Sequence, residues 1–180
     1  VRPIEDLTGR KHFNEVVFEN ALVSDDALLG TENDGWRQVG SELAIERSGP
    51  ERFLSCAVLF VELLKVLEKG DDQSAKREIG SILANLVTLR SMSLSVSGKL
   101  AQGDDVSLQA VIVKDLGAEF EQTLPGIVQN IVGIEPNLSD DAEPLAQVLA
   151  LLTMLAPSFS LRGGTVEILR GIIAKRLGIS

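Results

Sequence analysis

The sequence has few residues that could bind metals or form disulfides. Its 180 residues include one cysteine, Cys56, and one histidine, His12. A single cysteine excludes an intramolecular disulfide and zinc sites built from several cysteines. A single histidine likewise excludes metal clusters that need several histidines, and His12 lies in a polar turn that suggests no site. No metal centre is therefore expected.

Basic residues and long apolar runs are also scarce. Lys and Arg number 17 against 26 Asp and Glu, which gives a net charge of −9 and a pI near 4.7. Such an acidic chain is poorly suited to bind phosphate backbones, so no nucleic-acid partner is expected. No uninterrupted apolar run has the length that a bilayer requires, so no membrane span is expected. An acidic chain with one cysteine fits a cytoplasmic protein.

Enough apolar residues are present for a folded core, although aromatic residues make up only 4% of the chain and hydrophobic residues 44%. A chain of this length buries about 70% of the surface that its unfolded form exposes. The first residues, 1–4, contain no initiator methionine and no leader, and they resemble the middle of a strand. We therefore expect a fragment of a longer chain.

The N-terminal residues have the pattern of a β-hairpin. Residues 13–23 mix aromatic and β-branched residues with polar ones, which is typical of a half-buried strand. Residues 6–11 have turn composition and separate this strand from the short run 1–4. A lone hairpin is marginally stable in water, so these strands are expected to belong to a sheet completed upstream or in a partner.

After a polar loop the hydrophobic period becomes that of amphipathic helices. Helices are predicted at 35–47, 50–70, 73–101, 106–132, 142–156 and 165–177, with a joint at Ser48–Gly49 and a kink at Pro125. Cys56 is expected to be an inert core thiol, and Trp36 is expected to pack in the core under the hairpin. The predicted fold class is mostly α, an antiparallel bundle of long helices preceded by a short β-hairpin.

Three groups of residues resemble the acyl-CoA dehydrogenase family. Residues 1–4, 13–20 and 33–36 are similar to the end of its middle β-domain. The segment Leu43-Ala44-Ile45-Glu46-Arg47 resembles the start of the first long helix of its C-terminal domain, and residues 163–174 resemble its last active-site segment. The resemblance implies two parts. Residues 1–33 would be the end of a truncated middle β-domain, and residues 34–180 would be the C-terminal helical-bundle domain.

The resemblance also implies an activity. Members of this family oxidise an acyl-CoA thioester to the 2,3-enoyl-CoA, with a Glu base that removes the α-proton and FAD as the hydride acceptor. Their electrons pass to an electron-transfer flavoprotein, and their helical domains form homo- or hetero-oligomers. The isolated fragment would be inactive, because the flavin and acyl pocket need the missing β-domain. The acyl chain length is not predicted.

Two positions can supply the base in this family. Many members have a Glu immediately before the Gly-Thr of the final helix, where this chain has Gly163. Other members supply the Glu from the first long helix, at a position that matches Glu46. The resemblance therefore implies Glu46 as the catalytic base, with Glu42 and Glu51 as weaker candidates. The alternative is a solvated Glu46 that pairs with a neighbouring arginine.

The same resemblance places a cofactor site at the last helix. Gly164, Thr165 and Glu167 would line the FAD site, since glycines allow close approach and a helix N-terminus favours electron-rich groups. Two family strings that bind FAD are replaced, by residues 67–77, which include Asp71 and Asp72, and by residues 131–137, which include Glu135.

The replaced strings leave a second hypothesis open, a non-catalytic scaffold subunit of a hetero-oligomeric dehydrogenase. A third hypothesis, an unrelated helical bundle that acts as an interaction module, would require all three similarities to be coincidental.

Overall fold

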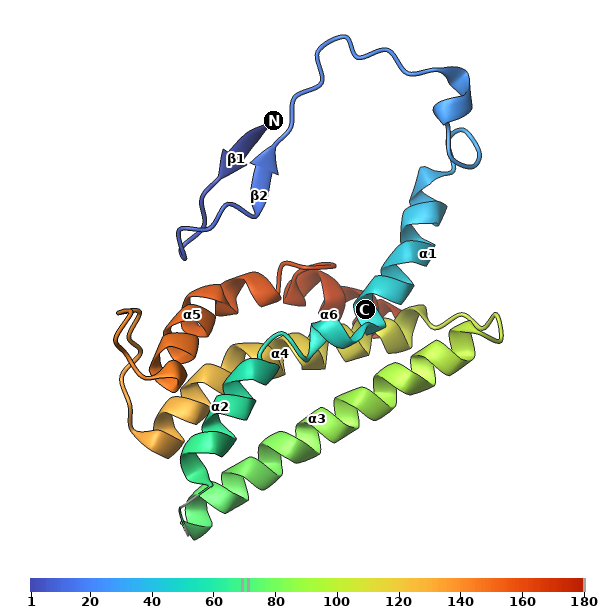
Figure 1. Ribbon diagram of the computed structural model, residues 1–180. Coiled ribbons are helices and arrows are strands. Elements are labelled where there is room, and N and C mark those ends of the chain that lie inside the picture. Colours follow the sequence, from blue (N-terminus) through green and yellow to red (C-terminus); the bar gives the residue numbers. More distant parts are fainter. Residues whose placement is uncertain (69, 71, 180) are drawn as a thin grey trace.

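A computed structural model describes residues 1–68, 70 and 72–179 as a helical bundle preceded by a two-stranded hairpin (Figure 1). The described elements are β1 (Arg2–Ile4), β2 (Phe13–Glu15), α1 (Gly35–Ser48), α2 (Ala57–Leu67), α3 (Gln73–Leu100), α4 (Ser107–Val132), α5 (Pro144–Phe159) and α6 (Val166–Arg176). Short 3₁₀ turns occupy Asp25–Ala27 and Pro50–Arg52. The predicted fold class is confirmed.

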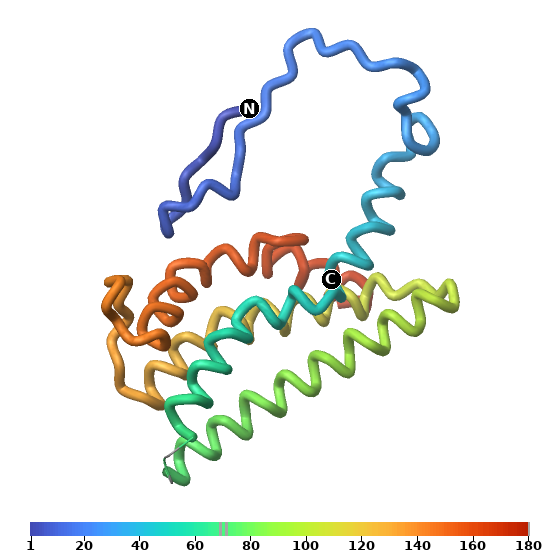
Figure 2. The backbone as a smooth tube through the Cα atoms, in the orientation of Figure 1, coloured from blue at the N-terminus to red at the C-terminus, as the bar shows by residue number. Residues whose placement is uncertain are grey.

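The hairpin is shorter than its sequence pattern predicts. β1 and β2 pair antiparallel, with Arg2 opposite Glu15 and Ile4 opposite Phe13. β2 ends at Glu15 rather than at residue 23, because β1 offers only three residues to pair with. The chain then runs away from the bundle before it enters α1 (Figure 2). Apolar side chains in this segment, such as Phe18 and Leu22, are exposed.

The long helices begin and end at residues with a clear physical role. The Asp72 side chain accepts a hydrogen bond from the Ser74 backbone N–H at 2.7 Å and so caps α3. Gly133 adopts a left-handed conformation with φ of 64° and ends α4. These signals are local, and for this reason the predicted bounds of α3 and α4 agree with the structure to within a residue.

The start of α2 differs from the prediction. Pro50 was expected to begin a helix, but it begins a 3₁₀ turn, and α2 starts only at Ala57. The Arg52 side chain folds back onto the end of α1, and Phe53 has φ of −149°, which is outside the helical region. The joint expected at Ser48–Gly49 is therefore a longer irregular segment, 49–56.

The core surrounds α4, which runs through the bundle and packs against α1, α3, α5 and α6. Buried apolar side chains from four helices meet there: Leu59, Leu63, Ile82, Leu89, Leu124, Val128, Leu145 and Leu149. α4 continues through Pro125, which has no N–H to offer the Glu121 carbonyl. That carbonyl instead accepts the Cys56 thiol at 3.4 Å.

Among the described residues, one helix, α3, is long and apolar enough to cross a bilayer by length and composition. A single such helix is weak support for a span, since the core helix of a globular domain satisfies the same criteria. α3 packs one face into the core through Ile82, Leu89 and Val96. The expectation of no membrane span stays a prediction.

Candidate functional site

The structure brings Glu46 and Gly163 together, although they are far apart in the sequence. Glu46 lies near the C-terminal end of α1, and Gly163 lies in the turn between α5 and α6. A Cβ atom added to Gly163 would lie 2.7 Å from Glu46 Oε2, so the carboxylate fills the space above this glycine. Gly163 also has a φ of 74°, a conformation that favours glycine. The two positions implied for a base therefore share one volume.

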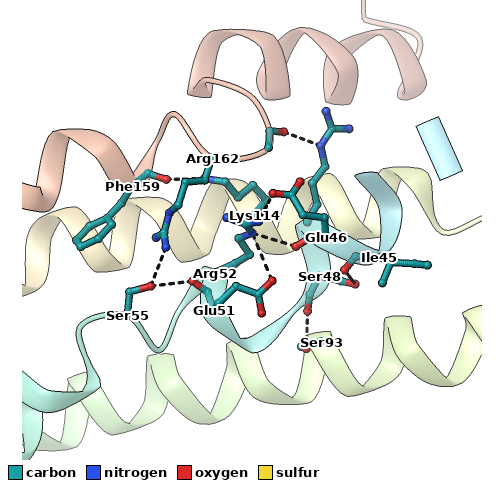
Figure 3. A network of polar contacts seen from close by, with 12 residues as sticks. Ile45, Glu46, Ser48, Glu51, Arg52, Ser55, Ser93, Lys114, Phe159 and Arg162 are labelled. Carbon is teal, nitrogen blue, oxygen red and sulfur yellow. Dashed lines mark hydrogen bonds and ion pairs between the residues drawn. The ribbon is translucent and has the colours of Figure 1, made fainter. Parts of the chain in front are cut away.

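The two oxygens of the Glu46 carboxylate have different surroundings. Oε1 pairs with the Arg52 guanidinium, which is almost fully buried (Figure 3). Oε2 is buried and has no hydrogen-bond partner. The side chain as a whole is 37% exposed, so Glu46 is a half-buried carboxylate with one free oxygen. Glu46 does pair with an arginine, as the alternative hypothesis of a solvated Glu46 expected, but its Oε2 oxygen is buried and not solvated.

A second arginine holds the glycine turn against α1. Arg47 Nε donates to the Gly163 carbonyl at 2.8 Å. Burial lowers the pKa of Arg47, and the neighbouring Glu46 opposes this effect. Gly164 has a φ of 115°, and a Cβ atom placed on it would contact the Arg47 guanidinium and Leu169. These contacts bring Gly164 to the same end of α1 as Glu46.

The other two predicted cofactor residues lie at the start of α6. Thr165 is the N-cap residue, but its side chain caps none of the first backbone N–H groups of the helix. Glu167 is exposed in the first turn. Its pKa is lowered, first by its own backbone N–H and then by a hydrogen bond with the Thr165 side chain. The described contacts attach Gly163 and Gly164 to α1, whereas Glu167 faces solvent.

The described residues fit FAD in one region and not in another. The glycine turn has no side chains, and the uncapped first turn of α6 suits an electron-rich ring edge. At the junction of α2 and α3, by contrast, Glu68 and Asp72 are exposed carboxylates that would repel a pyrophosphate. Lys69 and Asp71 of this stretch lie outside the described residues.

The second replaced string is also acidic. Glu135 is exposed and accepts a hydrogen bond from the Gln129 side chain at 3.3 Å. No step of a reaction is therefore assigned to the dinucleotide half of FAD on this chain.

A buried polar network that the sequence pattern did not predict lies next to Glu46. Glu121 of α4 is fully buried and accepts hydrogen bonds from the Ser55 N–H at 2.7 Å and from Arg162 Nη2 at 2.8 Å. Arg162 Nη1 also donates to the Ser55 hydroxyl at 3.0 Å (Figure 3). Burial raises the pKa of Glu121, and Arg162 opposes this effect. The pair connects α4 to the residue that precedes Gly163.

Lys114 of α4 is another buried charge near this turn. Its ammonium group donates to the Phe159 carbonyl at 2.8 Å, at the end of α5. Burial lowers the pKa of Lys114 to about 8, helped by the neighbouring Arg52 and Arg162. The sequence spacing could have indicated that these charges are buried. They lie three and four residues apart on the buried face of α4, which includes Lys114, Gly117, Glu121 and Leu124.

Two single-residue expectations have different outcomes. Cys56 is fully buried, and burial raises the pKa of its thiol to about 12, which confirms an inert core thiol. The prediction for Trp36 is wrong, because this side chain is 89% exposed on the first turn of α1. The hairpin does not cover it, since α1 projects away from the remaining helices at this end (Figure 1).

The fold corresponds to a known class of domain. A sequence profile described as acyl-CoA dehydrogenase, C-terminal domain, matches residues 33–178. The chain therefore belongs to the acyl-CoA dehydrogenase family.

Curated relatives agree with the family assignment. The chain is 28% identical over 182 residues to the acyl-CoA dehydrogenase FadE34 of Mycobacterium tuberculosis, covering 98% of this chain and 24% of that protein. It is also 28% identical over 182 residues to the acyl-CoA dehydrogenase IpdE1 of Mycolicibacterium smegmatis, covering 98% of this chain and 45% of that protein. The chain thus spans less than half the length of these relatives.

A solved structure has the same fold. The structure of the glutaryl-coenzyme A dehydrogenase glutaryl-CoA complex superposes with a TM-score of 0.67 at 17% identity. The match covers 88% of this chain and 42% of that chain. At this identity the likeness supports the fold alone.

Proposed function

We propose that this chain is the helical-domain part of an acyl-CoA dehydrogenase that forms a double bond between the α and β carbons of an acyl-CoA thioester. Glu46 would be the base. One observation carries the proposal, the buried and unpaired Oε2 of Glu46 that lies against Gly163. An oxygen that is withdrawn from water and has no donor is available to accept a proton from a bound substrate.

In this proposal the α-proton passes to Glu46 Oε2 as the Cα–H bond breaks. FAD, when bound, supplies the acceptor for the hydride that leaves the β-carbon. Arg52 holds Oε1, and Arg47 holds the Gly163 carbonyl, so the carboxylate and the glycine turn stay in place. Gly163 carries no side chain that would displace the carboxylate, and Gly164, Thr165 and Glu167 would border the cofactor.

The proposed partners follow from the family. An electron-transfer flavoprotein would accept the electrons, and the helical domain would take part in a homo- or hetero-oligomer. Exposed apolar side chains on α2 and α3, including Val58, Val61, Leu83 and Val87, offer a surface for such contacts. A cytoplasmic location is proposed on the acidic composition and the single cysteine.

The proposal is tested on the full-length protein. We expect it to purify with bound flavin and to exchange the α-protons of butanoyl-, octanoyl- or hexadecanoyl-CoA with deuterium from D₂O. Glu46→Gln should lower the exchange rate by about 10²- to 10⁴-fold while flavin stays bound. Glu78→Gln is the matched control, because Glu78 is an exposed glutamate of α3 that is not a candidate for the base. Unchanged exchange in Glu46→Gln would show that the base lies elsewhere.

A second candidate function is a non-catalytic scaffold subunit of a hetero-oligomeric acyl-CoA dehydrogenase. The acidic junction between α2 and α3 favours it, because Glu68 and Asp72 are exposed carboxylates in the stretch that, by resemblance, replaces a family string that binds FAD. This hypothesis predicts a colourless full-length protein that forms a stable complex with a flavin-containing paralogue. The flavin content of the purified protein separates the two candidates.

A further inference from the structure

The buried Arg52 contacts residue 46 through both the side chain and the backbone. Arg52 Nε donates to the Glu46 carbonyl at 2.9 Å, and Nη2 pairs with Glu46 Oε1. The arginine side chain is only 6% exposed. A guanidinium group is planar and rigid, so two of its nitrogens bound to one residue fix both the end of α1 and the direction of the carboxylate.

The backbone of Arg52 is itself fixed by α4. Any side chain at Gly117 would overlap the Arg52 carbonyl oxygen, so the turn at Pro50–Arg52 packs directly on the α4 backbone. The position of the guanidinium is therefore determined by the bundle core and not by a flexible loop.

The pairing leaves the two carboxylate oxygens with different roles. Because Arg52 anchors Oε1, rotation of the carboxylate is restricted, and Oε2 remains without a partner beside Gly163. A second acidic residue, Glu51, lies 3.9 Å from Arg52 Nε, but its side chain is 52% exposed. The buried contacts of Arg52 are thus directed to Glu46.

We propose that Arg52 is a positioning residue for the Glu46 carboxylate, which it holds by Oε1 so that Oε2 stays directed at the space above Gly163. This inference rests on the proposed role of Glu46 as the base. A purely structural role, in which Arg52 only caps the end of α1, is the alternative that the test must separate.

The experiment uses full-length protein and measures deuterium exchange at the α-carbon of the acyl-CoA, among the three named above, that wild type exchanges fastest. Arg52→Met should lower the maximal exchange rate by about 10- to 100-fold, the usual result of a small misplacement of a reacting group. The concentration of acyl-CoA at half-maximal exchange should change by less than about twofold, because Arg52 holds the base and not the substrate. Arg37→Met is the matched control, since Arg37 is an exposed arginine of α1.

Two further variants separate the loss of the Arg52 contact with Glu46 from a general loss of folding. Arg52→Lys retains the charge but not the planar fork, and we expect it to restore only part of the rate. Arg52→Ala should regain exchange when guanidinium ion is added at concentrations below those that unfold the protein, whereas Glu46→Gln should not. Failure of guanidinium to restore any exchange would count against the positioning role.

Crystal structures of the full-length variants provide a readout besides activity. In Arg52→Met the Glu46 carboxylate should turn away from Gly163, and an unchanged carboxylate with unchanged exchange would overturn the inference. If Glu46→Gln lowers exchange but the Arg52 variants do not, only the positioning role fails. If Glu46→Gln exchanges normally, the proposed base and this inference both fail.

Discussion

Two regions of the bundle interior are built from different kinds of side chains. Where α1 meets the turn between α5 and α6, the interior holds Arg52, Lys114 and Glu121. Between α2, α3 and α5 it is built from apolar side chains such as Leu59 and Leu149. Buried charges contribute little net stability, because desolvation offsets their attraction. The apolar region therefore stabilises the fold, and the charged region lies beside the candidate site.

The largest effect is expected from Arg162→Met. This change leaves Glu121 fully buried without its cation, which should lower the free energy of unfolding by about 3–5 kcal/mol at neutral pH. Denaturant titration measures the loss. Arg170→Met is the control, because Arg170 is mostly exposed and its ion pairs should contribute about 1 kcal/mol or less. Equal losses in both variants would remove the distinction between the buried network and an ordinary surface pair.

Leu149→Ala tests the apolar region. Leu149 is fully buried, and its truncation should leave a cavity and cost about 2–5 kcal/mol. Because Leu149 belongs to the core cluster away from Glu46, the full-length variant should keep the wild-type rate of α-proton exchange per folded molecule. A selective loss of exchange with little loss of stability would contradict the separation of the two regions.

Lys114→Met tests the charged region through its pH dependence. The pKa of Lys114 falls from 10.5 to about 8 on folding, so between these values the unfolded chain binds a proton that the folded chain has lost. Wild-type stability should therefore rise with pH between about 8 and about 9, at up to about 1.4 kcal/mol per unit. Above pH 9 the raised pKa of Cys56 opposes the rise, because the unfolded thiol loses a proton that the buried thiol keeps. Lys114→Met should lack this rise, and Lys65→Met, at an exposed lysine, should keep it. Denaturation curves measured from pH 7.5 to about 9, below the range in which the unfolded Cys56 thiol ionises, compare the three proteins.

Gly117→Ala tests the contact between α4 and the Pro50–Arg52 turn. The added methyl group would overlap the Arg52 carbonyl and push the Pro50–Arg52 turn away from α4, at a cost of about 1–3 kcal/mol. Gly126→Ala is the matched control, because nothing lies within 4 Å of a Cβ atom at that position of α4. Since alanine favours helix over glycine, the control should be neutral or slightly stabilising. Thermal unfolding of both variants compares them directly.

Trp36→Phe should have the smallest effect. The indole is exposed in this chain, so the free energy of unfolding should change by less than about 0.5 kcal/mol. The fluorescence of the wild-type 180-residue chain should be that of a water-exposed indole, readily quenched by iodide or acrylamide. A quencher-protected Trp36 would show that the N-terminal region packs on the bundle.

The sequence predicted those parts of the fold that depend on local signals. The capping residue Asp72 and the left-handed Gly133 mark helix ends, and the apolar periods of α3 and α4 continue without interruption. The predicted start of α2 was wrong. Pro50 suits the first turn of a helix, and nothing in the local sequence shows that the Arg52 side chain donates a hydrogen bond to the Glu46 carbonyl. The prediction that Trp36 packs in the core was wrong for a similar reason, since the apolar character of a side chain does not guarantee a neighbour to pack against.

The residues of the candidate site stay a prediction, and their relative geometry could not be predicted from the sequence. Resemblance to the family singled out Glu46 and the Gly163–Gly164 turn, yet their proximity depends on contacts between segments more than 100 residues apart. The Glu121 and Arg162 pair was missed altogether, because a charged residue on a helix is exposed in most proteins. Only its place on the buried stripe of α4 distinguishes Glu121 from a surface glutamate.

The contact between Glu46 and Gly163 constrains how this sequence can change. A side chain at residue 163 and a glutamate at residue 46 occupy the same volume, and the φ of 74° at Gly163 adds strain for any other residue. With Glu46 as the proposed base, each change alone is expected to be harmful, because shortening residue 46 removes the carboxylate and enlarging residue 163 collides with it. The two positions should therefore show sign epistasis, in which a carboxylate can move from α1 to the turn only through paired substitutions.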